Sequence, residues 1–114
     1  MNLQFTITGQ GAGVVKIDGG LNAANVDTFR DQCSRWLAEN VGVNLIVLDL
    51  GAVDFIDSAG LGVLIAILKR VSERGGDIRL ARLQKQARIV FEITRAHKIF
   101  DIFDSVEDAL QAKS

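Results

Sequence analysis

A short apolar run near the middle of the chain limits the folds that are open to it. Residues 44–50 read NLIVLDL, and a run this short and this rich in branched side chains is typical of a strand buried on both faces. Apolar residues then recur at helical spacing from Ser58 to the Gly75–Gly76 pair, which is expected to end the helix. A buried strand followed by an amphipathic helix indicates an α/β fold with right-handed crossovers.

The rest of the chain predicts strands and helices in alternation after an opening hairpin. Residues 3–8 alternate in hydrophobicity, and a glycine-rich turn separates them from a second strand at 14–18. We therefore expect a mixed, largely parallel sheet within one domain that spans residues 1–114. The other expected elements are a helix from Asn22 or Asn25 to about 40–42, a strand at 77–83, a helix at 84–96, a short strand at 99–103 and a last helix capped by Asp104 or Ser105.

Charge and cysteine content exclude several classes of function. The formal net charge is −1, so the chain has no basic field, and neither nucleic acid nor a membrane is an expected partner. Cys33 is the only cysteine and His97 the only histidine, so we expect no disulfide and no metal site. The N-terminus lacks the pattern of a signal peptide, and the apolar run 59–68 is too short to span a bilayer. These features predict a cytoplasmic protein.

The stretch VDFIDSAGLGVL, residues 53–64, places Ser58 where a strand gives way to a helix. A catalytic serine on a nucleophile elbow needs glycine two positions before it and two after it. Gly60 fits that pattern, but Ile56 does not, and His97 is the only available base. We therefore expect no catalytic residues and no enzyme activity. Two other interpretations stay open, a helix cap worth about 1 kcal/mol and a phosphorylation site.

The residues after Ser58 favour the phosphorylation site. Gly60 and Gly62 lie in the first turns of the helix, where each costs about 0.8–1 kcal/mol relative to alanine, so close approach by another backbone is expected. Val63 and Ile67 lie off the main apolar stripe, and if exposed they form an apolar patch typical of a partner site. A phosphate on Ser58 would gain from the helix N-terminus and would add charge to that interface.

Residues 46–62, IVLDLGAVDFIDSAGLG, resemble the signature of STAS domains and specifically of bacterial anti-sigma factor antagonists. The segment Gly20-Leu21-Asn22 resembles the G-x-L-D segment of the family, although Asn22 stands where many members have an acid. Residues 95–98, RAHK, replace a more usual Gly-Leu step before lysine. The D-S-x-G-L-G core of the signature matches at Asp57, Ser58, Gly60, Leu61 and Gly62.

The resemblance implies a sheet of four to five strands with helices mainly on one side, and it implies a regulatory cycle. The unmodified antagonist would bind an anti-sigma factor that is also a serine kinase of the histidine-kinase-like ATPase fold. That kinase would phosphorylate Ser58, which would release the antagonist, and a PP2C-type phosphatase would reverse the modification. ATP belongs to the kinase in this cycle, so no cofactor is expected in this chain.

A non-switching STAS scaffold is the alternative, as in stressosome-type or lipid-transport complexes. There the same surface would bind its partner permanently, and Ser58 would be mainly a cap. A sulfate-transporter STAS domain is not expected, because no membrane helices precede the chain. The partner-binding residues expected in either case are Asn22, Asp54, Asp57, Ala59, Gly60, Leu61, Gly62, Val63 and Ile67.

Overall fold

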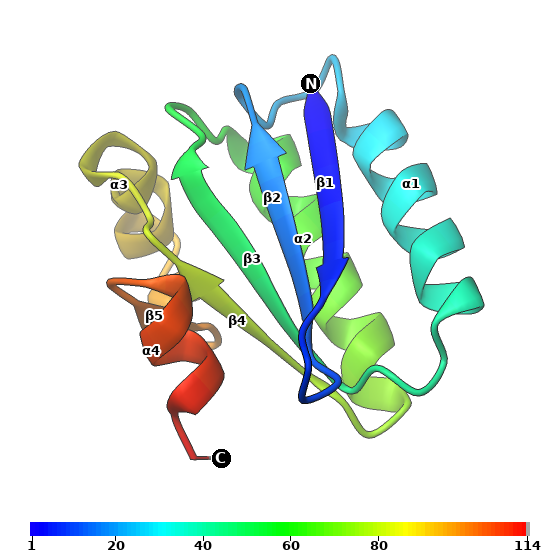
Figure 1. Ribbon diagram of the computed structural model, residues 1–114. Helices are drawn as coiled ribbons and strands as arrows, with labels where there is room; N and C mark the ends of the chain where they lie inside the picture. Colours follow the sequence, from blue (N-terminus) through cyan, green and yellow to red (C-terminus); the bar gives the residue numbers. More distant parts are fainter. Residues whose placement is uncertain (114) are drawn as a thin grey trace.

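Strand β3 (Leu45–Ala52) lies at the centre of a five-stranded sheet in the computed structural model, which describes residues 1–113 (Figure 1). The strand order is β1-β2-β3-β4-β5. β1 (Asn2–Ile7) pairs antiparallel with β2 (Gly13–Asp18). Parallel pairs join β2 to β3, β3 to β4 (Asp77–Ala81), and β4 to β5 (Asp101–Phe103). The predicted fold class, with a mixed and largely parallel sheet, is therefore confirmed.

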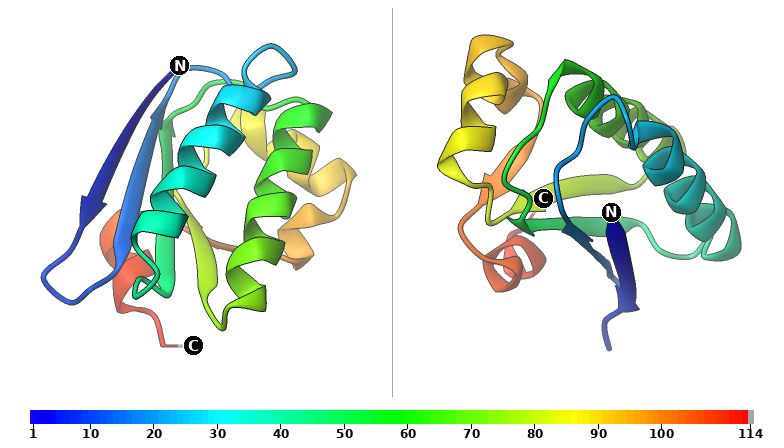
Figure 2. Two further views of the ribbon diagram at one scale, coloured as in Figure 1. Left: turned by 90° about the vertical axis from the view of Figure 1, so that its right-hand side faces the viewer. Right: turned by 90° about the horizontal axis from the view of Figure 1, so that it is seen from above.

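The helices lie mainly on one side of the sheet, as predicted. α1 (Val26–Glu39), α2 (Ser58–Glu73) and α3 (Lys85–Ile93) contribute to the main hydrophobic core on one face. α4 (Val106–Gln111) covers part of the opposite face and packs in a smaller apolar cluster. The view from above in Figure 2 shows the sheet edge-on, with α1, α2 and α3 on one side and α4 on the other. A short 3₁₀ helix, η1 (Ala96–Lys98), follows α3.

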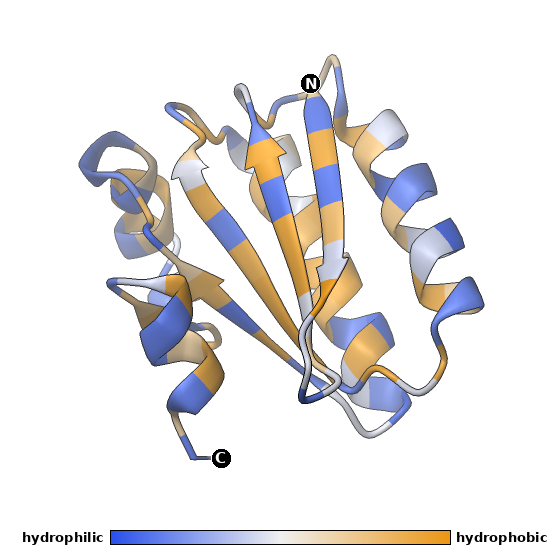
Figure 3. Ribbon diagram, viewed as in Figure 1, coloured by the Kyte–Doolittle hydropathy of each residue, from blue (hydrophilic) through white to orange (hydrophobic). Residues whose placement is uncertain are grey.

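Alternate side chains of β3 point to opposite faces of the sheet and are buried on both. This explains why the sequence of β3 is almost continuously apolar. Ile46, Leu48 and Leu50 belong to the main core under α1 and α2. Val47 points to the other face and packs with Ala109 of α4. Figure 3 shows mostly hydrophobic colour along β3, whereas hydrophobic and hydrophilic bands alternate along β1.

The elements near the C-terminus are shorter than the sequence predicts. β4 ends at Ala81, because Arg82 adopts a left-handed backbone conformation with φ 62°. The helix expected to continue to residue 96 ends at Ile93, and Arg95, also at φ 62°, separates it from η1. The predicted domain includes Ser114, which lies outside the described residues. No helix formed by residues 1–113 is both long enough and apolar enough to cross a membrane.

Candidate functional site

Two loops meet at the carboxyl edge of the sheet. β2 and β3 are parallel neighbours, so the loop from β2 to α1 and the loop from β3 to α2 leave from the same edge. Leu21 and Ile56 form an isolated parallel bridge between these loops. The Leu21 N–H donates to the Phe55 carbonyl at 2.9 Å, and the Asp57 N–H donates to the Leu21 carbonyl at 3.2 Å. The two loops therefore form one continuous structure beside the start of α2.

Asp57, and not Ser58, caps the N-terminus of α2. Asp57 has the extended backbone of an N-cap, with φ −93° and ψ −175°, and its carboxylate accepts from the Gly60 N–H at 2.8 Å. The other carboxylate oxygen accepts from the Ala23 N–H at 3.1 Å. The interpretation of Ser58 as the helix cap is therefore wrong, because Asp57 accepts the first-turn hydrogen bond and Ser58 is the first helical residue.

The hydrogen bond from the Gly60 N–H lowers the pKa of Asp57 below its ordinary value of 3.8. Partial burial acts in the opposite direction but is outweighed, and the Ala23 N–H lowers the pKa further. The carboxylate is therefore ionised at neutral pH. It places a negative charge directly before Ser58, whose side chain is exposed.

Four residues of the predicted partner surface are buried, so the prediction of a patch at Val63 and Ile67 is wrong. Val63 is 2% exposed and Ile67 3% exposed. α2 packs against α1, α3 and β4, so its buried arc is wider than a single stripe. The other two buried members are Gly60 and Leu61.

The exposed side of α2 presents a different set of residues. Gly62, Ile65 and Ala66 lie one or two turns beyond Ser58 and are exposed, Ile65 at 37%. Phe55, in the loop before α2, is 54% exposed and adds an aromatic ring near the same end of the helix. Sequence reasoning missed Phe55, Ile65 and Ala66, although spacings of three and four residues along α2 connect the latter two to Ser58 and Gly62.

The two glycines of the motif have different roles. A Cβ at position 60 would collide with the backbone carbonyl of Leu21, so Gly60 allows the β2–α1 loop to approach the helix. This confirms the expected close backbone approach at Gly60. A Cβ at Gly62 would meet no atom within 4 Å. Nothing in the described chain therefore requires glycine at position 62.

The remaining predicted residues lie around the same two loops. The Asn22 side chain accepts from the Ala24 N–H at 2.9 Å and so shapes its own loop. Asn25 occupies the N-cap position of α1, but its side chain makes no hydrogen bond to the helix. Instead it accepts from the Asn22 N–H and donates to the Gly20 carbonyl. Asp54 is exposed and Ala59 half-buried beside Ser58.

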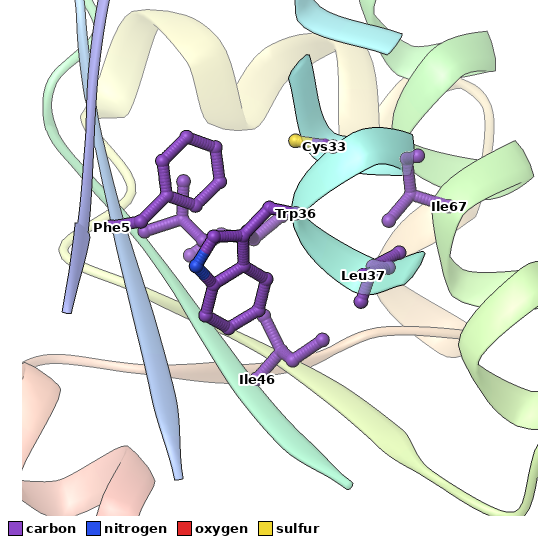
Figure 4. Close-up of a pocket in the computed structure, with 8 residues that line it drawn as sticks. Phe5, Cys33, Trp36, Leu37, Ile46 and Ile67 are labelled. Carbon is purple, nitrogen blue, oxygen red and sulfur yellow. The ribbon is translucent and has the colours of Figure 1, made fainter. Parts of the chain in front are cut away.

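The described residues contain no other arrangement with evident chemistry. They include no group of three or more His, Cys, Asp or Glu side chains placed to hold a metal ion. Burial raises the pKa of Cys33 to about 12, so its thiol is not a nucleophile at neutral pH. Cys33 lines an apolar cavity between the sheet and α1 (Figure 4), but its volume of about 10 Å³ is too small for a ligand.

Comparison with known proteins identifies relatives of this chain. BtrV, a candidate anti-sigma factor antagonist of Bordetella bronchiseptica, is 33% identical over 96 residues, covering 84% of this chain and 81% of BtrV. TM1081, a candidate anti-sigma factor antagonist from Thermotoga maritima, has 30% sequence identity to this chain. Its crystal structure superposes with a TM-score of 0.79, covering 96% of this chain and 92% of TM1081.

The anti-sigma factor antagonist SpoIIAA of Bacillus is similar in fold. Its unphosphorylated form has a TM-score of 0.80 at 19% identity, with 96% of this chain and 93% of SpoIIAA covered. Its phosphorylated form has a TM-score of 0.72, also at 19% identity, with 96% of both chains covered. The STAS domain model matches residues 6–109, nearly the whole chain. The chain therefore belongs to the STAS domain family.

Proposed function

We propose that this STAS domain is a non-enzymatic, cytoplasmic anti-sigma factor antagonist that works by partner switching. In its unphosphorylated form it binds an anti-sigma factor and thereby frees a sigma factor. The anti-sigma factor is also a serine kinase of the histidine-kinase-like ATPase fold, and it releases the antagonist by phosphorylating Ser58. A PP2C-type phosphatase restores the binding form. The relatedness to BtrV and TM1081 supports the anti-sigma factor as the class of partner.

The position of Ser58 carries the proposal. It is the exposed first residue of α2, while Asp57 provides the cap. A phosphate can therefore be added to the Ser58 hydroxyl without removing a hydrogen bond that the start of the helix needs. A residue that is neither cap nor core, at the centre of a motif shared with a switching family, is suited to modification.

The same position makes phosphorylation costly for a docked partner. A phosphate adds a charge of about −1.5 to −2, next to the carboxylate of Asp57. The helix N-terminus favours this charge in the free protein, but a partner that covers Ser58 must desolvate it. A loss of about 3 kcal/mol weakens binding roughly a hundredfold. The switch thus acts through interface electrostatics and needs no refolding.

The surface around Ser58 suits close docking. Gly62 has open space above it, so a backbone or ring of the partner can approach the helix there. Phe55 and Ile65 offer exposed apolar groups of the kind that anchor protein interfaces. We propose that these residues, together with Ala66 and the loop residues Asn22, Asp54 and Asp57, form the contact surface.

The test combines phosphorylation and affinity with the candidate kinase encoded nearest to this gene. Intact mass and peptide mapping after incubation with ATP should show one phosphate, on Ser58. The Ser58→Ala variant should bind the kinase and stay unmodified. Ser72→Ala, which removes an exposed serine near the other end of α2, should behave as wild type.

Each outcome of this experiment has a distinct meaning. Phosphorylation of Ser58 with a roughly hundredfold loss of affinity supports the switch. Tight binding that ATP leaves unchanged, with no phosphate on Ser58, contradicts it and favours a permanent scaffold.

A further inference from the structure

Strand β1 is one edge of the sheet, and it carries none of the devices that keep other strands away. Among the described residues 1–113, β1 pairs with no strand but β2. Residues 1–15 contain no charged side chain, the first being Lys16, and the chain has no proline. Natural sheets usually protect an exposed edge with charges, proline, a bulge or a very short strand. β1 has six residues and pairs with β2 in a regular register.

The opposite edge is protected, which makes the contrast informative. β5 has only three residues and begins with the exposed Asp101. Asp104, also exposed, follows it directly. One edge of this sheet is therefore short and flanked by charge, whereas the other is long and neutral.

A groove runs beside the unprotected edge, under α1. The ring of Phe5 stacks on that of Trp36, with centroids 5.3 Å apart, and Figure 4 shows the two rings between β1 and α1. A shallow groove of about 290 Å³ is lined by Phe5, Gln32, Arg35, Trp36 and Glu39. Ile7, at the end of β1, is 49% exposed. An added strand would thus find apolar contacts as well as free backbone groups.

We propose that β1 pairs antiparallel with β1 of a second copy of this chain, which joins the two sheets into one. The edge is self-complementary, as a two-fold interface requires. Leu3, Phe5 and Ile7 alternate along the same face of β1. If Phe5 lies opposite its counterpart, Leu3 of one copy faces Ile7 of the other. This single register covers the apolar side chains of Leu3 and Ile7 in both copies.

Charges at the groove favour the same arrangement. Arg35 and Glu39 are exposed on α1 and form no ion pair within residues 1–113. A two-fold axis through the Phe5 pair sets the two α1 helices antiparallel, so that Arg35 of one copy lies toward Glu39 of the other. The net charge of −1 adds little repulsion between copies. The pairing uses β1 and α1 and leaves Ser58, on α2, outside the contact.

Sedimentation velocity over a wide range of protein concentration tests the dimer. Wild type should associate reversibly. Ile7→Lys places a charge on the edge and should raise the dissociation constant about tenfold or more. Ile93→Lys is the matched control, since Ile93 is 76% exposed on α3, away from this edge. In a sample that mixes isotope-labelled and unlabelled chains, we expect intermolecular NOEs between Leu3 and Ile7.

A charge exchange on α1 provides a second test that leaves the strand intact. Glu39→Arg should weaken the dimer, and adding Arg35→Glu should restore it. A protein that stays monomeric at every concentration overturns the proposal. So does a dimer that survives Ile7→Lys while Ile93→Lys disrupts it, because another surface would then be responsible.

Discussion

The carboxylate of Asp57 accepts a hydrogen bond from the backbone N–H of Ala23, at 3.1 Å, across a separation of 34 positions in the sequence. The same carboxylate caps α2 through the Gly60 N–H. One side chain therefore ties the N-terminus of α2 to the loop that precedes α1. The following predictions concern this junction and the segments around it.

The stability supplied by Asp57 should be lost in acid. Its pKa in the folded protein is lowered from 3.8, chiefly by the Gly60 N–H, so the ionised form is favoured by folding. The stability that Asp57 contributes is complete above pH 3.8, which is its pKa in the unfolded chain. It disappears as the pH falls through the lower pKa of the folded protein.

An NMR titration of the Gly60 and Ala23 amide shifts measures this transition. Asp57→Asn is the matched control, because asparagine also caps helices well but does not titrate in this range. An amide titration that persists unchanged in the Asn variant would assign the effect to another group.

Alanine substitutions at the two motif glycines should have opposite effects on stability. Gly60→Ala drives a Cβ into the Leu21 carbonyl and should destabilise the fold by about 1–3 kcal/mol. Gly62→Ala meets open space and should stabilise α2 by about 0.8–1 kcal/mol. Urea unfolding measures both. If the partner approaches at Gly62, the stabilised variant should also bind it more weakly.

Replacing Arg95 with glycine should stabilise the protein. Arg95 has φ 62°, a left-handed conformation that costs a non-glycine residue about 1–2 kcal/mol. Since glycine loses more entropy on folding, the expected net gain is up to about 1 kcal/mol. Thermal unfolding measures it. Arg88→Gly, within α3, should instead destabilise by about 1 kcal/mol. Equal losses in the two variants would rule out strain at Arg95.

Cys33 should be inert in the folded protein. Burial raises its pKa to about 12, and the thiolate is the reactive form. A colorimetric thiol reagent at neutral pH should therefore react only as fast as the protein opens, and at once in denaturant. An exposed cysteine introduced by Ser72→Cys in a Cys33→Ala background is the reactive control. Rapid native labelling of Cys33 would mean that the α1 side of the core opens readily.

Local patterns predicted much of this fold. The apolar run at 44–50 predicted β3, because burial on both faces removes the alternation that a half-exposed strand shows. The helix predicted from Asn22 or Asn25 to about 40–42 is α1, and its buried residues Phe29, Cys33 and Leu37 follow one another at four-residue spacing along one side.

The cap and the exposed side of α2 depended on contacts that no local pattern contains. Asp57 and Ser58 are both good caps by residue type, and the Ala23 N–H, from a distant loop, was not visible in the sequence. Val63 and Ile67 are buried because α1 and α3 flank α2. Spacing within one helix shows that a second apolar side exists, but it cannot show which neighbours cover it.

The bridge between Leu21 and Ile56 has a consequence for how a partner associates. It extends the pairing of β2 and β3 into the loops that carry the site, so these loops are already ordered in the free chain. Docking then has little conformational entropy to remove from them. Association should be close to rigid-body, and a modification at Ser58 should act mostly on the dissociation rate.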